Sequence, residues 1–176
     1  MPVIAHGGDP DKAEREQREF YELLGRAISQ WAEVETGIYH TYRRVTDPGD
    51  WVAAAAGFHS IVNSNTKLEM IEAAISTSRR YSSQAEAWAK LHKKIRKNSA
   101  RRAKLAHWTV LQKVFRGDGT SMCLMSPIYD FGRHTEEGAP EEIGAKQIAE
   151  WSGAFVRLAK DVDAFWRQLS WLQTPP

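Results

Sequence analysis

Apolar residues recur every three or four positions along most of this chain, a spacing typical of amphipathic helices. The pattern predicts four long helices, over 9–46, 50–79, 82–107 and 141–172. Asp9 and Asp50 precede the first two and can cap them, because an aspartate side chain accepts hydrogen bonds from the first backbone N–H groups of a helix. The first helix should end before 47–49, where Asp-Pro-Gly favours a turn.

The last predicted helix has the clearest pattern. Its apolar positions follow a seven-residue repeat, made up of Ile148, Trp151, Phe155, Leu158, Val162, Phe165, Leu169 and Leu172. Such a repeat places one apolar seam along a helix and suits it to packing against other helices. We therefore expect an antiparallel bundle.

The segment between the third and fourth helices lacks a helical pattern. Over 108–126, short apolar runs flank a glycine-rich turn and predict an extended β-hairpin insertion, with a third helix continuing to Phe115 as the alternative. Residues 127–140 combine glycine, proline and charge without periodicity and are expected to form a loop. The expected fold class is all-α: one domain over 1–176, a bundle of four long antiparallel helices with a short extended insertion between the third and the fourth.

Composition narrows the class of protein. The 176 residues, 42% of them apolar, are enough for one domain with a full core. Cys123 is the only cysteine, which excludes an intramolecular disulfide and a thiol-rich zinc site. The six histidines are scattered, with no two on one helical face, so we expect no metal and no other cofactor. No apolar run approaches the roughly 20 residues that a membrane span requires, so we expect a cytoplasmic protein without membrane contact.

Charge is distributed unevenly along the chain. Between Glu86 and Asp118 there is no acidic residue, but there are ten basic ones: Lys90, Lys93, Lys94, Arg96, Lys97, Arg101, Arg102, Lys104, Lys113 and Arg116. Because the net charge is only +2, the rest of the chain carries about −8. A basic segment of this kind suits the phosphate backbone of RNA or an acidic protein partner.

Helical phase divides the polar residues of the third helix between two faces. One line, expected to be solvent-exposed and to bind a partner, contains Lys90, Lys94, Lys97, Arg101 and Lys104. Asn98 and Arg102 instead continue the apolar line. Glu35 and Asn65 lie among apolar residues of the first two helices in the same way. Because an unpaired buried charge is costly, a Glu35–Arg102 ion pair between helices is the structural interpretation of these positions.

The third helix ends in Arg102-Ala103-Lys104-Leu105-Ala106-His107. This Arg-x4-His spacing, within this order of helices, resembles HEPN-domain proteins across nearly the whole chain. Many HEPN domains are dimeric, metal-independent ribonucleases, so the resemblance implies a homodimer that acts on RNA without a cofactor. The family usually has a polar residue directly after the arginine, where this chain has Ala103. If Arg101 is the arginine, Arg102 is the polar residue after it, and five residues rather than four separate the arginine from His107.

These residues have coherent roles in RNA cleavage. His107 is suited to act as general base or acid on a ribose 2′-hydroxyl or a leaving oxygen, since imidazole exchanges protons near neutral pH. Arg102 would hold the phosphate through its planar guanidinium, and Asn98 would orient either group. In an ideal helix Arg102 and His107 lie about 140° apart, and a symmetric dimer would solve this by lining one groove with two helix ends. The alternative is a non-catalytic RNA-binding or assembly module, in which His107 only caps the helix.

Overall fold

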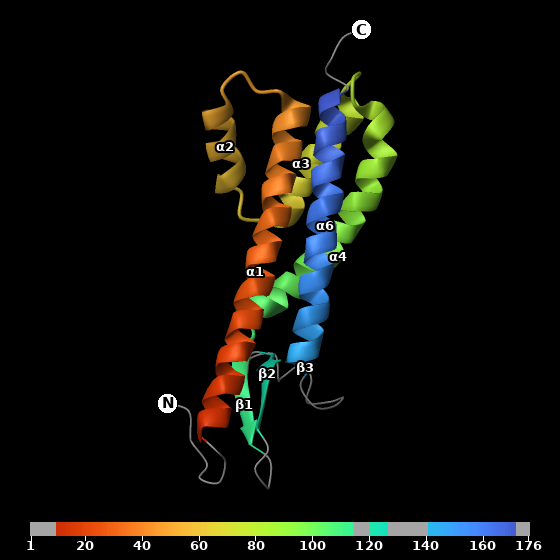
Figure 1. Ribbon diagram of the computed structural model, residues 1–176. Helices are drawn as coiled ribbons and strands as arrows, with labels where there is room; N and C mark the ends of the chain where they lie inside the picture. Colours follow the sequence, from red (N-terminus) through yellow and green to blue (C-terminus); the bar gives the residue numbers. More distant parts are fainter. Residues whose placement is uncertain (1–9, 115–119, 127–140, 172–176) are drawn as a thin grey trace, which may run out of the picture. The chain divides into compact units, whose positions relative to one another are not determined.

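The computed structural model describes residues 10–114, 120–126 and 141–171 (Figure 1). Helices dominate them: α1 (Pro10–Thr46), α2 (Trp51–Ser60), α3 (Ser64–Thr77), the 3-10 turn η1 (Ser82–Gln84), α4 (Ala85–His107) and α6 (Ala145–Trp171). Three short strands, β1 (Thr109–Val114), β2 (Thr120–Met125) and β3 (Glu142–Gly144), lie between α4 and α6 in sequence. The mainly helical class expected from the sequence is therefore confirmed. The Asp9 cap, the turn at 116–119, the loop at 127–140 and Leu172 lie outside the described residues.

The chain forms two compact units, and each takes part of the three long helices. Residues 1–29 and 101–152 belong to the first, which we call the sheet unit. Residues 30–100 and 153–176 belong to the second, which we call the helical unit.

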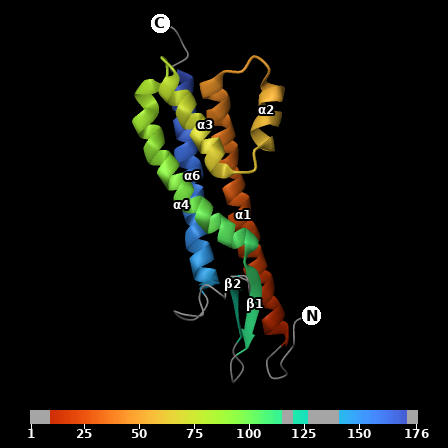
Figure 2. The same ribbon diagram turned by 180° about the vertical axis from the view of Figure 1, so that it is seen from behind.

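The sheet unit contains an antiparallel sheet of order β1-β2-β3, which lies beside the N-terminal half of α1 in both views (Figures 1 and 2). Thr109 of β1 lies opposite Met125 of β2, and Leu124 of β2 lies opposite Ile143 of β3. Leu124 and Ile143 are fully buried. The prediction that the last helix begins at 141 is wrong: Glu142–Gly144 pairs with the free edge of β2, and the helix begins only at Ala145.

The helical unit has an aromatic and aliphatic core. Trp88 of α4 and Phe155 of α6 are the largest of its fully buried side chains. The ring centre of Trp31 lies 5.3 Å from that of Phe155, and the ring centre of Trp88 lies 5.5 Å from that of Phe165. The seven-residue repeat of α6 is buried here, as the pattern predicts, at Phe155, Leu158, Val162, Phe165 and Leu169.

The single helix expected over 50–79 is instead two helices, α2 and α3. Asp50 caps α2 as expected, since its carboxylate accepts hydrogen bonds from the backbone of Val52 and Ala53. The break follows because the Asn63 side chain caps α3 by accepting from the backbone N–H of Asn65. Asn65 was expected to interrupt an apolar stripe, but it is exposed in the first turn of α3.

Gly37 permits a close approach of α1 and α6. A Cβ at this position would lie 2.7 Å from Cγ1 of Val162, a side chain with little rotamer freedom. We expect Gly37→Ala to lower the free energy of unfolding by about 1–3 kcal/mol. The control is Gly25→Ala on the same helix, where nothing lies within 4 Å, and there we expect a gain of up to about 1 kcal/mol. Denaturant unfolding measures both, and equal effects would contradict the close packing at Gly37.

Candidate functional site

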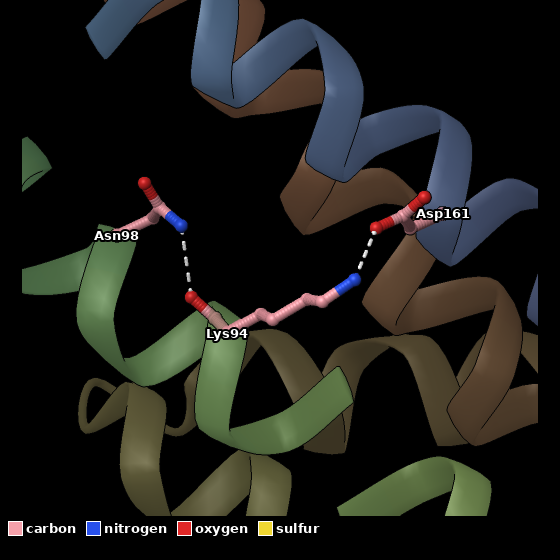
Figure 3. Close-up of polar contacts among 3 residues, drawn as sticks. All are labelled: Lys94, Asn98 and Asp161. Atoms are coloured by element: carbon pink, nitrogen blue, oxygen red, sulfur yellow. Dashed lines mark hydrogen bonds and ion pairs between the residues drawn. The ribbon is translucent and has the colours of Figure 1, made fainter. Parts of the chain in front are cut away.

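Helix α4 carries most of the polar residues that the sequence singled out. Its apolar line is buried at Trp88, Leu91, Ile95 and Leu105. Asn98 continues this line and is also buried, with an exposed fraction of 9%. Its amide nitrogen donates to the backbone oxygen of Lys94 at 2.9 Å, which holds the side chain against its own helix (Figure 3). The binding role predicted for Asn98 therefore applies to a side chain that is buried and held by its own helix.

Acidic residues from other elements offset much of the basic face of α4. Lys94 forms an ion pair with Asp161 of α6 at 2.9 Å, between side chains that are 61% and 47% exposed (Figure 3). Lys104 pairs with Glu141 at 2.5 Å, and beyond the helix Lys113 of β1 pairs with Glu142. Exposed pairs of this kind contribute only about 0–1 kcal/mol to stability, but they reduce the positive charge available to a partner.

Three basic residues of α4 remain exposed and form no ion pair or hydrogen bond within the described residues. They are Lys93, Arg96 and Lys97, which we call the α4 patch. Positions 93, 96 and 97 share one face of the helix, because residues three and four apart are neighbours on a helical surface. Of the predicted basic face only Lys97 belongs to this patch, and together with Lys93 and Arg96 it is free to bind a phosphate backbone.

Arg102 and His107 both belong to the sheet unit, in the last turns of α4. Arg102 is half-buried, and its Nε atom is buried without a hydrogen-bond partner among the described residues. His107 is the last residue of the helix and is exposed, and no hydrogen bond or ion pair joins it to that part of the chain. In a purely structural pair, both side chains would have all their hydrogen bonds made within the protein. Arg102 and His107 do not meet this condition in the described part of the chain.

Arg101 and Lys104 lie closer to the protein than their helical phase suggested. Arg101 is half-buried, with its guanidinium carbon 5.8 Å from the ring centre of Trp151. The Lys104 ammonium lies 4.9 Å from the ring centre of Trp108 in addition to its pairing with Glu141. The expectation that this end of the face is fully solvated is wrong, because two indoles cover it through cation–π contacts.

Glu35 does not lie in the buried stripe of α1 where the sequence placed it. Val34 lies in the core between Trp31 and Ile38, and Glu35, one residue further, is exposed. Its carboxylate accepts a hydrogen bond from Nε1 of Trp31 at 2.9 Å. Glu35 is therefore not the buried charge that the sequence suggested, and it lies at the edge of a cavity in the helical unit.

A second polar cluster, which the sequence analysis missed, lines a groove between α1 and α6 of about 510 Å³. Asp163 accepts from Arg167 at 2.7 Å and from Nε1 of Trp166 at 3.0 Å, and the hydrogen bond from Arg167 lowers the pKa of Asp163. The ring of His40 lies 5.1 Å from that of Trp166. Burial lowers the pKa of His40, and the nearby Arg43 lowers it further. Only the i, i+4 spacing of Asp163 and Arg167 could have indicated this cluster in the sequence.

Two kinds of site can be assessed directly over 10–114, 120–126 and 141–171. No group of three or more His, Cys, Asp or Glu side chains in these ranges could hold a metal ion. None of their helices is both long and apolar enough to cross a membrane. Comparison of the chain with family models, curated proteins and solved structures gave no match.

Proposed function

We propose that this chain is a HEPN-like, RNA-directed protein that cleaves RNA without a metal ion and acts as a homodimer. The observation that carries the proposal is the state of the Arg102 and His107 side chains. His107 is exposed at the end of α4, and the Nε atom of Arg102 has no hydrogen-bond partner in the described ranges. In the same proposal the helices form one antiparallel bundle, with the strands as its insertion.

In this proposal the residues cleave a phosphodiester bond by proton transfer. His107 takes the proton of a ribose 2′-hydroxyl, whose oxygen attacks the adjacent phosphorus. The bond to the 5′-oxygen of the next nucleotide breaks, and a cyclic 2′,3′-phosphate remains. The protonated His107 of the second protomer donates a proton to the leaving oxygen, and Arg102 stabilises the negative charge that develops on the phosphate. Two protomers are needed because Arg102 and His107 lie about 140° apart on an ideal helix.

Cleavage of RNA in the presence of EDTA tests this function. We expect the wild-type protein to cut structured or single-stranded RNA, and to fail where the 2′-hydroxyl at the cleaved position is replaced by hydrogen. Arg102→Ala is expected to slow cleavage about 100- to 1,000-fold, as the loss of one charge-stabilising group does elsewhere. A wild-type protein that cuts none of the RNAs would contradict the catalytic function.

A non-catalytic binding module is the second candidate. The ion pairs of Lys94 and Lys104 favour it, because they leave a smaller basic surface than the sequence suggested. Ala103, where the HEPN family usually has a polar residue, also favours it. This candidate predicts affinity for RNA without cleavage, or binding to an acidic protein partner.

The α4 patch and the paired lysine beside it should respond differently to mutation. We expect Lys97→Ala to weaken RNA binding. The slope of log affinity against log salt concentration should become less steep by about the amount that one phosphate contact contributes. Lys94→Ala is the matched control, and we expect little change because Asp161 already offsets its charge. Binding isotherms at several salt concentrations measure both. Equal losses from the two variants would contradict the assignment of RNA binding to the α4 patch.

A further inference from the structure

The helical unit contains a cavity of about 300 Å³ between α1, α2, α3 and α4. Its lining includes Trp31, Glu35 and Tyr39 from α1, Phe58 from α2, Lys67 from α3 and Ile95 from α4. This volume is at the lower end of the range for small-molecule sites, and the mixture of apolar walls with a few polar groups is typical of them. Neither Arg102 nor His107 lines it.

One face of α1 supplies the acidic side of the cavity. Trp31, Glu35 and Tyr39 follow one another at intervals of four residues, so they share that face. Trp31 donates to Oε1 of Glu35 at 2.9 Å and so orients the carboxylate. No cationic side chain in the described part of the chain pairs with Glu35. The cavity therefore has a fixed negative group that is free to accept further hydrogen bonds.

Lys67 supplies the basic side. Its ammonium lies 4.9 Å from the ring centre of Phe58, and it forms no ion pair with an acid of the described ranges. The hydroxyl of Tyr39 is buried and has no hydrogen-bond partner in the same ranges. Because solvent does not reach this hydroxyl, Tyr39 contributes its ring rather than its hydroxyl to the wall of the cavity.

We propose that this cavity binds a free amino acid with a large apolar side chain, such as phenylalanine or leucine. Glu35 receives the ammonium group, Lys67 receives the carboxylate, and Trp31, Phe58 and Ile95 surround the side chain. A zwitterion fits because the cavity offers one unpaired group of each sign. A simple anion such as phosphate would face the Glu35 carboxylate, and a simple cation would face the Lys67 ammonium.

Isothermal titration calorimetry of the full chain with phenylalanine and leucine tests this site. Two analogues each lack one charge: 2-phenylethylamine has no carboxylate, and 3-phenylpropanoate has no ammonium. We expect phenylalanine to bind at least about tenfold more tightly than either analogue, since each lost charged hydrogen bond lowers affinity by about that factor or more. Absence of binding at millimolar concentrations, or equal affinity for phenylalanine and both analogues, would overturn the proposal.

Variants that remove one charge from the cavity then show which residue binds the ammonium group and which binds the carboxylate. Glu35→Gln should weaken phenylalanine binding about tenfold or more and should not weaken 3-phenylpropanoate binding, because that anion is repelled by the Glu35 carboxylate. Lys67→Met should weaken phenylalanine binding and should not weaken 2-phenylethylamine binding, because that cation is repelled by the Lys67 ammonium. The matched control is Glu69→Gln, an exposed acid of α3 outside the cavity, which should change neither. If Glu35→Gln and Glu69→Gln behave alike, the proposed role of Glu35 is wrong.

This site and the proposed RNA site can fail separately. Glu35→Gln and Lys67→Met are expected to cleave RNA at the wild-type rate, because neither residue belongs to the last turns of α4. Amino acid binding that persists in the Arg102→Ala variant would support the cavity site whether or not the protein cuts RNA. Loss of amino acid binding in that variant, with folding intact, would overturn the assignment to this cavity.

Discussion

His107→Ala is expected to slow RNA cleavage about 100- to 10,000-fold, the usual effect of removing a general acid or base. The effect should be on the rate constant of cleavage rather than on RNA affinity, since we propose that His107 acts on the reacting oxygens and that the α4 patch binds the backbone. Single-turnover cleavage with protein in excess over RNA separates the two quantities. We expect the variant to fold normally, because the His107 side chain is exposed and makes no contact that the core depends on.

The control for His107→Ala is Gln112→Ala, an exposed polar residue of β1 in the same sheet unit. We expect this variant to cleave RNA at the wild-type rate, and both variants to keep the wild-type melting temperature. Wild-type cleavage by His107→Ala would contradict the catalytic role of the histidine. If that variant still bound RNA while neither it nor the wild type cut it, the non-catalytic module would be the better description.

Trp88→Ala is expected to lower the free energy of unfolding by about 3–5 kcal/mol, the typical cost of truncating a large buried aromatic residue. Trp88 is 0% exposed and packs against Phe165 across the α4–α6 contact. An alanine there would leave a cavity that the surrounding helices can only partly fill. Denaturant unfolding followed by circular dichroism measures the loss, and at this size it is a large fraction of the stability of an ordinary domain.

Two variants show whether this effect comes from burial. Trp51→Ala removes the same side chain from a position that is 57% exposed at the start of α2, and we expect a loss of about 1 kcal/mol or less. Trp88→Phe should cost less than Trp88→Ala, because it keeps a ring and removes an indole N–H that is buried without a partner in the described chain. Equal losses at positions 51 and 88 would contradict the placement of Trp88 in the core.

The sequence by itself determined the long helices and their buried faces. The stripes of α4 and α6 are local patterns, because residues three and four apart on a helix point the same way whatever the rest of the chain does. The structure buries these positions, from Trp88 and Ile95 in α4 to Phe155 and Leu169 in α6. The motif that ends in Arg102 and His107 could likewise be found from local spacing, together with its place at the end of a helix.

Where two local signals compete, the sequence alone did not decide between them. The apolar pattern continued through 61–63 and predicted one helix, whereas the capping side chain of Asn63 favoured a new start, and in the structure the cap prevails. Similarly, Glu142–Gly144 could begin a helix or extend a sheet. The free edge of β2 decides for the sheet, and that edge belongs to a segment about twenty residues earlier in the chain.

Only the tertiary structure decided which charges are free. Lys94 and Asp161 are 67 residues apart in the chain, and Lys104 and Glu141 are 37 apart, so no local pattern could pair them. Their pairing removes Lys94 and Lys104 from the predicted basic face, of which Lys97 remains in the α4 patch. The same holds for the cavity: the spacing of Trp31, Glu35 and Tyr39 is visible in the sequence, but Lys67 meets them only because α3 folds back against α1. Helical phase is a property of neighbouring residues, whereas charge pairing and cavities depend on contacts between distant ones.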